Sequence, residues 1–381
     1  MGEFPFRPAA DDLDRIGRDV AAIPDIQAVL QANDPAHLKA RDRVAHQYQI
    51  AGGKVVLRIA SDLPESLGGI GLFEPDAEYV GIGRVSTGEG CPHAETEPDF
   101  LGMRLAFQTR DGVRVDFLGI NDPSSPTDTH AEFVKLLAAG AAGAGHGFFA
   151  SEVRVLSSLT HSLGPVRGSV IAAHATAQTV RAATSATAYQ TYWTGIVEIA
   201  GAPGKFVIDP VSQENHLRSL TSSARHLTDD WNGRQAHGAL AFDLFWIPFI
   251  DEHATSLTEL MRAWKEQRAL IGRVTFPQCD HTSEDARRWA ALANEMGANA
   301  GNWVADRANT IAQPATEFGV ARKIAYRQSQ DGRNALPEAG YADVFRTGTI
   351  GAELAQELDR RRALKRDLGH VDSAPSQDST A

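Results

Sequence analysis

Two β-prone runs that flank an Asp-Gly turn restrict the possible folds of this chain more than any other feature of its sequence. The first run covers residues 103–107, the turn lies in residues 109–112, and the second run covers residues 113–117. Alternating runs on either side of an Asp-Gly pair predict a β-hairpin. The central part of the chain should therefore contain antiparallel strands.

Further β-prone segments precede and follow this hairpin. They cover residues 54–59, 79–85, 188–194, 195–200, 205–208, 239–250 and 273–276. Antiparallel strands in this number usually close into a barrel or a sandwich. We therefore predict an α+β fold with an antiparallel β-barrel at its centre.

Helices are expected before, within and after this β-rich part. The segments that we interpret as helical cover residues 11–23, 26–43, 129–140, 148–163, 256–264, 283–296, 317–327 and 350–368. We divide the chain into an N-terminal helical arm, a barrel domain with inserted helices, a C-terminal helical region and a disordered tail. These parts cover residues 1–45, 46–280, 281–370 and 371–381, respectively.

The composition excludes several classes of function. The formal net charge is -11, so the chain lacks the basic surface that non-specific nucleic-acid binding requires. No run of about 18 apolar residues is present, so we expect no membrane-spanning helix. The two cysteines, Cys91 and Cys279, cannot form a disulfide framework, and residues 1–18 lack the order of a signal peptide. We therefore expect a cytoplasmic protein.

A candidate metal ligand lies in residues 322–326, whose sequence is Arg-Lys-Ile-Ala-Tyr. Residues four apart share one face of a helix, so the guanidinium of Arg322 can lie against the phenol of Tyr326. A permanent cation favours the phenolate form of tyrosine, and a phenolate is a hard anionic ligand suited to ferric haem iron. An amphipathic helix with an inward-facing tyrosine explains the same residues without any ligand.

Three upstream segments, read in order with residues 322–326, resemble the catalase family. They are residues 43–46 (Arg-Val-Ala-His), 84–89 (Arg-Val-Ser-Thr-Gly-Glu) with the continuation to 107, and 116–123 (Asp-Phe-Leu-Gly-Ile-Asn-Asp-Pro). The order and the spacing match the family over about residues 40–330. Later segments resemble its shortened branch, which holds small catalase-like peroxidases and fatty-acid hydroperoxide enzymes such as allene oxide synthase. The resemblance implies a catalase-like barrel and bound haem b.

The resemblance also implies residues on the peroxide-binding side of that haem. His46 is similar to the distal histidine, which takes and returns a proton of the peroxide. Asn121 is similar to the second asparagine of the family's pair and would orient the peroxide. Ser86 is similar to the serine that hydrogen-bonds the histidine ring. Histidine suits the proton transfer because its pKa is close to neutrality.

The other matched residues would hold the haem itself. Arg43 and Arg84 are similar to arginines that pair with the haem propionates. Arg322 and Tyr326 are similar to the proximal arginine and the tyrosine that binds the iron. The C-terminal helical region would therefore carry the metal ligand, and an anionic ligand of this kind donates electron density to the iron.

The chain departs from the family pattern on the peroxide-binding side. Val85 replaces the phenylalanine of the Arg-Phe-Ser-Thr segment, and Ile120 replaces the first asparagine of the pair. Residues 123–126 read Pro-Ser-Ser-Pro, where catalases have Pro-x-Phe-Phe. The loss of two phenylalanines should widen the haem pocket. It favours an organic hydroperoxide, or oxidation of a reducing co-substrate, over rapid dismutation of hydrogen peroxide.

From these features we predict a haem-dependent peroxidase that acts on hydrogen peroxide or organic hydroperoxides. A peroxide, an organic electron donor and a second copy of the chain in a homodimer are the expected partners. One alternative is a catalase-fold protein that binds haem or a lipophilic ligand without turning over peroxide. Others are a fatty-acid hydroperoxide isomerase and a structural barrel without haem.

Overall fold

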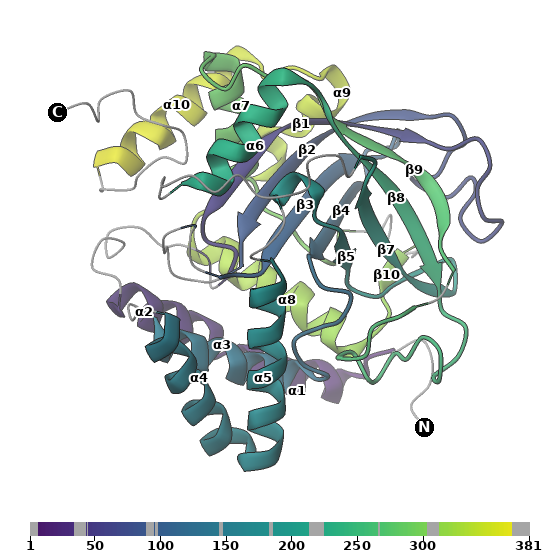
Figure 1. Ribbon diagram of the computed structural model, residues 1–381. Coiled ribbons are helices and arrows are strands. Elements are labelled where there is room, and N and C mark those ends of the chain that lie inside the picture. Colours follow the sequence, from purple (N-terminus) through teal and green to yellow (C-terminus); the bar gives the residue numbers. More distant parts are fainter. Residues whose placement is uncertain are drawn as a thin grey trace.

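Eight antiparallel strands close into a barrel at the centre of the molecule, as seen in the computed structural model (Figure 1). The structure describes residues 7–33, 43, 45–88, 95, 98–144, 148–182, 186–212, 225–265, 267–302 and 312–367. The barrel strands are β1 (Gln49–Ile59), β2 (Glu78–Thr87), β3 (Leu101–Gln108), β4 (Arg114–Ile120), β5 (Tyr192–Thr194), β7 (Ala202–Pro210), β8 (Leu240–Pro248) and β9 (Ala269–Phe276). The predicted α+β fold with an antiparallel barrel is confirmed.

The pairing order explains how the barrel closes. The strands follow each other in the order β7-β5-β4-β3-β2-β1-β9-β8, and β8 pairs with β7 to complete the ring. Two short strands, β6 (Val197–Ile199) and β10 (Ala312–Pro314), extend the sheet beside β7. The predicted hairpin is formed by β3 and β4, with Leu105 opposite Phe117 and a positive φ of 89° at Gly112 in the turn.

Aromatic side chains fill the interior of the barrel. Phe117 packs edge-to-face against Phe206 with ring centroids 5.0 Å apart, and Phe206 contacts Trp246 at 4.8 Å. Each of these three side chains is at most 1% exposed. Because alternate side chains of a strand point to opposite faces, the residues between them point out of the barrel. These outward positions are available to build a site.

A helical layer covers one side of the barrel (Figure 1). It consists of α1 (Ala10–Val20), α2 (Ile23–Asn33), α3 (His130–Gly143), α4 (Phe148–Leu163), α5 (Pro165–Ala182) and α8 (Glu317–Gly332). Buried apolar residues join the first helices to α8, among them Ile16, Val20 and Val320. The buried ring of His130 on α3 lies 2.7 Å from a carboxylate of α1 and 2.8 Å from one of α8. Segments far apart in the sequence are thereby held in one layer.

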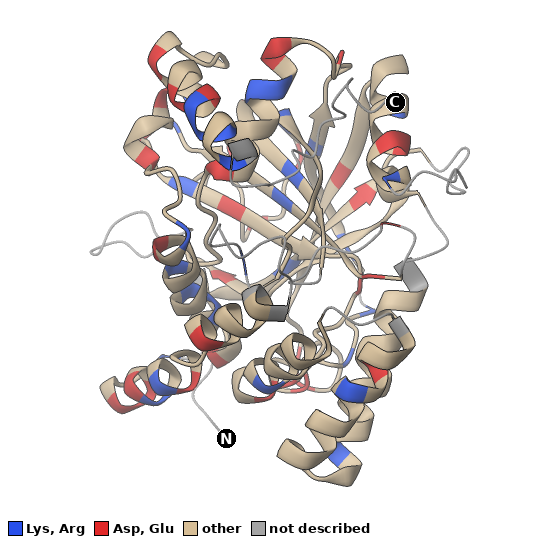
Figure 2. Cartoon of the chain, turned by 90° about the vertical axis from the view of Figure 1, so that its left-hand side faces the viewer, with Lys and Arg blue, Asp and Glu red and all other residues tan. Residues whose placement is uncertain are grey.

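The remaining helices pack elsewhere on the barrel. They are α6 (His226–His237), α7 (Glu284–Glu295), α9 (Ala342–Thr347) and α10 (Ala352–Asp367). The last two pack with α7 through an apolar cluster that contains Leu292 and Leu358. On the face shown in Figure 2, basic and acidic residues are interspersed on the helices rather than separated by sign. Ion pairs also join neighbouring helices, as between Arg288 on α7 and Asp359 on α10, whose charged groups lie 2.8 Å apart.

Some predicted elements differ from the structure. The helix predicted for residues 256–264 is wrong, because side chains in and just before this segment bind its backbone. Glu252 accepts from the amide of Leu257 at 3.2 Å, and the indole of Trp264 donates to the carbonyl of Ser256 at 3.0 Å. Helices α5, α6 and α9 were not predicted. Most of residues 34–43 and the whole predicted tail lie outside the described residues. Within the described part, no helix combines the length and the apolar composition needed to cross a bilayer.

Candidate functional site

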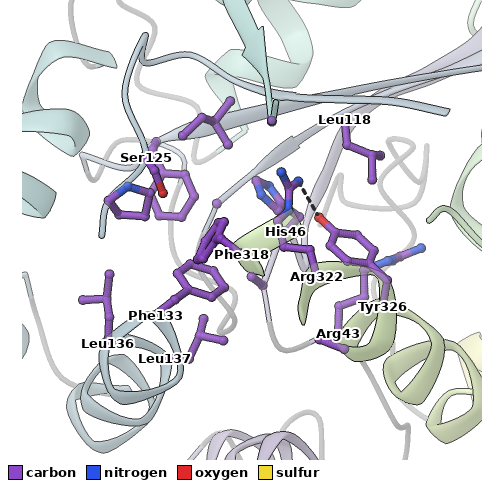
Figure 3. Close-up of a pocket in the computed structure, with 18 of the residues that line it drawn as sticks. Arg43, His46, Leu118, Ser125, Phe133, Leu136, Leu137, Phe318, Arg322 and Tyr326 are labelled. Atoms are coloured by element: carbon purple, nitrogen blue, oxygen red, sulfur yellow. Dashed lines mark hydrogen bonds between the residues drawn. The ribbon is translucent and has the colours of Figure 1, made fainter. Parts of the chain in front are cut away.

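A cavity of about 360 Å³ lies between the barrel and the helical layer. Outward-facing residues of β2, β3, β4, β5 and β7 form one wall, and residues of α1 to α5 and α8 contribute to the other. Figure 3 shows its polar end, with His46, Arg43, Arg322 and Tyr326 on one side of the view. Of the seven predicted site residues, all except Asn121 line this cavity.

The strand wall is built by two rows of side chains that run across three paired strands. The register places Ser86, Gly102 and Ile120 in one row. Arg84 and Arg104 lie opposite each other in the next outward-facing row. The alternate residues of these strands point into the barrel core, so the row pattern follows from strand geometry alone. The wall therefore combines two cations, one hydroxyl and one glycine, Gly102, where no side chain covers the backbone.

The ring of His46 packs directly on Gly102. A Cβ atom added to Gly102 would lie 2.4 Å from Nδ1 of the ring, so only glycine leaves room for it. Nδ1 lies 3.1 Å from the carbonyl oxygen of Thr87 and 3.4 Å from Oγ of Ser86. His46 has a φ of 57°, which is uncommon for a residue other than glycine, and its amide donates to the carbonyl of Gly88 at 2.9 Å. The backbone is thus constrained to present the ring to the cavity.

These contacts define the protonation state of the ring. A carbonyl oxygen can only accept, so Nδ1 of His46 carries the hydrogen and Nε2 is the unprotonated nitrogen of the neutral ring. Burial, together with the nearby charges of Arg84, Arg322 and Arg43, lowers the pKa of His46 to about 3. The ring is therefore neutral near pH 7 with an unprotonated Nε2, and its pKa lies well below the value close to neutrality that was expected from the residue type.

Arg322 and Tyr326 are brought together one turn apart on α8, as predicted. Nη2 of Arg322 lies 3.4 Å from the phenolic oxygen of Tyr326, and the guanidinium carbon lies 5.6 Å from the ring centroid. The helix begins at the N-cap Thr316, whose side chain accepts from the amide of Gly319. A Cβ atom added to Gly195 would lie 2.7 Å from Nη1 of Arg322, so this glycine provides the space for the guanidinium.

Further guanidinium groups gather where α7 ends. Arg43 donates to Oδ1 of Asn294 at 3.0 Å, and Arg104 and Arg333 donate to the carbonyl of Met296 at 3.3 and 3.0 Å. The last carbonyl groups of a helix have no partner within the helix and carry partial negative charge, so they attract cations. Burial lowers the pKa of Arg104 to about 9. Together with Arg84, these side chains make one end of the cavity cationic.

Sequence reasoning missed Arg104 and Arg333 as site residues. Arg333 comes seven residues after Tyr326, and this spacing of two helical turns was the signal that could have indicated a shared face. Arg104 could have been found only from the register of β3 against β2, which places it opposite Arg84.

Asn121 does not enter the cavity, and this corrects the position predicted for its amide. Its Oδ1 accepts from the amide of Leu101 at 2.7 Å, and its Nδ2 donates to the side chain of Gln190 at 3.3 Å. The preceding residue, Ile120, lines the cavity and completes the row that contains Ser86. Because neighbouring residues of an extended chain point to opposite sides, Asn121 turns away from His46.

Apolar side chains form the rest of the cavity. Phe133, Leu136 and Leu137 project from α3 and Phe318 from α8. In Figure 3, Phe133 and Phe318 lie between the polar end and Ser125. The two phenylalanine rings meet edge-to-face with their centroids 5.3 Å apart. The segment 123–126, in which the phenylalanines of catalases are absent, also lines the cavity. One chamber therefore joins a cationic end with a neutral base to an apolar part.

The donor set is suited to haem. Guanidinium groups bind carboxylates such as the propionates, a tyrosine beside an arginine can bind ferric iron, and the apolar walls suit a porphyrin. Because residues 102 and 195 are glycines, they have no side-chain atoms that would occupy the space of His46 and Arg322. The residues present therefore fit this cofactor.

Comparisons with known proteins identify the fold. No family model matches the sequence, and no curated protein matches it. Among solved structures, a fungal catalase superposes with a TM-score of 0.61 at 13% identity, covering 77% of this chain and 59% of the catalase. Catalase A from Saccharomyces cerevisiae gives 0.60 at 12% identity, with 81% and 63% covered, and a bacterial catalase gives 0.59 at 16%, with 78% and 58% covered. The chain thus spans about three fifths of these catalases, and it has a catalase-like fold.

Proposed function

We propose that this protein is a haem-dependent peroxidase that consumes hydrogen peroxide or an organic hydroperoxide. One observation carries the proposal: a single cavity contains the neutral base His46, the Arg322–Tyr326 pair and a cluster of guanidinium groups. The catalase-like fold supports it, since the similar solved structures are those of catalases.

The residues that would hold the haem b follow from their chemistry. Tyr326 would bind the iron, with Arg322 stabilising the phenolate, and Arg43, Arg84 and Arg333 would pair with the propionates. When bound, the haem supplies the redox-active iron that cleavage of an O–O bond requires.

His46 would perform the proton transfer. Nε2 accepts the proton of the peroxide and delivers it to the oxygen that leaves as water or an alcohol. The hydrogen bond from Nδ1 to Thr87 keeps Nε2 unprotonated beforehand, and Ser86 stabilises the orientation of the ring. Two electrons and two protons from an organic donor complete the reduction of the peroxide to water and an alcohol or a second water.

The test is the visible spectrum of the haem-reconstituted protein, compared with two tyrosine variants. Tyr326→Phe should lose or alter the ferric spectrum. Tyr341→Phe is the matched control, because Tyr341 also accepts from an arginine, Arg114, at 3.1 Å but does not line the cavity. Its spectrum should equal that of the wild type. A wild-type protein that takes up no haem, or a spectrum indifferent to Tyr326, would refute the proposal.

A second candidate is a protein that binds haem or a lipophilic ligand without turning over peroxide. The position of Ile120 favours it, because no amide at this place can orient a bound peroxide. Adding peroxide and an organic donor to the haem-loaded protein separates the two candidates, since only the peroxidase oxidises the donor. Rearrangement of a fatty-acid hydroperoxide without consumption of donor would instead identify an isomerase.

We further propose that the protein works as a homodimer in the cytoplasm. The two cysteines of the whole sequence suit a reducing compartment. Sedimentation of the purified protein measures the oligomeric state, and a monomer at micromolar concentration would contradict the dimer.

A further inference from the structure

The outer face of the hairpin formed by α4 and α5 is apolar. In the described part of the chain, six of the twelve large apolar side chains that are exposed lie on these two helices; they are Phe149, Val153, Leu156, Val166, Val170 and Val180. In Figure 1 the two helices extend beyond the rest of the helical layer, away from the barrel. Large exposed apolar patches on soluble proteins mark interaction sites. This face is therefore a candidate interface.

The exposed apolar residues of α5 follow the spacing of a coiled-coil seam. They are separated by four, three, four and three residues along the helix, at Val166, Val170, Ala173, Ala177 and Val180. Apolar residues at an average spacing of 3.5 form one continuous seam that faces a partner helix. None of the exposed side chains that the structure describes on this helix carries a charge. The pattern therefore favours packing against another helix.

Helix α4 runs antiparallel beside α5 and widens this face. A Cβ atom added to Gly168 would lie 2.5 Å from backbone atoms of α4, and the hydroxyl of Thr176 donates to the carboxylate of Glu152. These two contacts fix the level of one helix against the other, and they place Val153 about level with residues 173–177. The small residues of the seam thus have a large apolar side chain of α4 beside them.

The seam is complementary to itself when a second copy runs in the opposite direction. If Ala173 faces the same residue of the second copy, Val166 comes opposite the partner's Val180, because both lie seven residues from Ala173. Val170 then comes opposite the partner's Ala177, so that large side chains meet small ones and can pack closely. The antiparallel arrangement also opposes the two helix dipoles, which is favourable. Such a pair has two-fold symmetry, as most homodimers have.

The composition fits a second copy better than a lipid surface. Helices that lie on a bilayer combine aromatic or leucine side chains with a basic polar face. The exposed seam of α5 consists instead of valine and alanine. Arg167, the basic residue whose side chain is described on this helix, is paired with Asp128 and Glu132 at 2.8 and 2.6 Å.

The size of the face suits a dimer. Helix α5 has 18 residues and is therefore about 27 Å long, and two helices side by side are about 20 Å wide. The face then covers about 500 Å² on each copy, or about 1,000 Å² for the pair, which is the lower limit for a specific interface.

We propose that two copies of this chain associate through the α4–α5 hairpin, in an antiparallel two-fold arrangement centred on Ala173. The two hairpins together form a four-helix bundle, with the seams in its interior. This inference rests on the homodimer that is part of the proposed function, and it names the interface. It does not depend on the haem.

The experiment measures self-association of the purified full chain by sedimentation. The concentrations run from about 1 to 100 μM, which cover the dissociation constants expected for a small interface. Ala173→Arg brings two like charges together at the centre of the pair and should weaken the dimer at least about 100-fold. Ala236→Arg is the matched control, because Ala236 is an exposed alanine on α6, elsewhere on the barrel. It should sediment as the wild type does.

A mixing experiment separates this contact from a loss of folding. A mixture of the Ala173→Arg and Ala173→Glu proteins brings opposite charges together across the two-fold axis. The mixture should form a dimer that neither protein forms alone, and an unfolded variant could not do so.

Three results would overturn the inference. If Ala173→Arg dimerises as tightly as Ala236→Arg, the homodimer uses another surface. If the mixture stays monomeric, the pair is not centred on Ala173. A wild type that is monomeric at about 100 μM would overturn the homodimer as well, and its flotation with phosphatidylcholine vesicles would then assign the face to lipid. None of these results changes the haem spectrum that tests the peroxidase, so the two proposals fail separately.

Discussion

Substitution of Gly102 by alanine should displace the proposed base without removing any functional group. Gly102 lies on β3 beneath the ring of His46, and the added Cβ atom would be 2.4 Å from Nδ1 and 2.5 Å from Cε1. Ordinary contacts of this kind are about 3.5 Å, so the ring must move by roughly 1 Å. The movement breaks the 3.1 Å contact between Nδ1 and the carbonyl of Thr87, because the backbone of His46 is itself constrained.

The expected magnitude follows from this displacement. Overpacking of a well-packed site typically costs about 1–3 kcal/mol, so the free energy of unfolding should fall by that amount. A reacting group misplaced by about 1 Å can lower a rate about 100-fold. We therefore expect Gly102→Ala to lose about two orders of magnitude in peroxide turnover while remaining folded.

The assay compares peroxide consumption at equal haem content, together with unfolding in denaturant. Gly53→Ala is the matched control, because Gly53 lies on β1 of the same barrel and an added Cβ meets nothing within 4 Å. It should keep both activity and stability within error. If Gly102→Ala consumed peroxide as fast as Gly53→Ala, the ring of His46 would not be the base, and the reasoning from this geometry would be refuted.

Three further predictions test other parts of the site and the fold. The pKa of His46 is lowered from 6.5 to about 3, so the unfolded chain binds more protons than the folded chain between these pH values. The free energy of unfolding should therefore fall as the pH drops from about 6.5 to about 3, and His46→Gln should show a shallower fall in denaturant titrations over this range. Arg333→Leu should weaken haem binding about tenfold or more in spectroscopic titrations, whereas Arg346→Leu, at an exposed arginine, should not. Equal haem affinities of the two variants would show that Arg333 is not part of the site. Gly168→Ala should destabilise the α4–α5 pair by about 1–3 kcal/mol in thermal unfolding, because its Cβ would lie 2.5 Å from backbone atoms of α4. Gly140→Ala on α3 is the control, since its Cβ meets no atom within 4 Å and the change should be neutral or stabilising.

The parts of the fold that could be predicted are those encoded by neighbouring residues. The β3–β4 hairpin follows from the Asp-Gly turn between two alternating runs, and it appears with Leu105 opposite Phe117. The pairing of Arg322 and Tyr326 depends only on a spacing of four residues on one helix, so it was also predictable. The helix predicted for residues 256–264 was wrong although its spacing was suitable, since hydrogen bonds from the side chains of Glu252 and Trp264 to the backbone of this segment compete with the helix.

The sequence by itself therefore determined the local elements and the types of residue that the site would need. The tertiary structure decided which of them meet. It placed Ile120 rather than Asn121 in the cavity, because neighbouring side chains of an extended chain point to opposite sides. It gathered Arg104 and Arg333 at the end of α7. Strand register and helix packing bring together residues that are far apart in the chain, and no local pattern encodes those contacts.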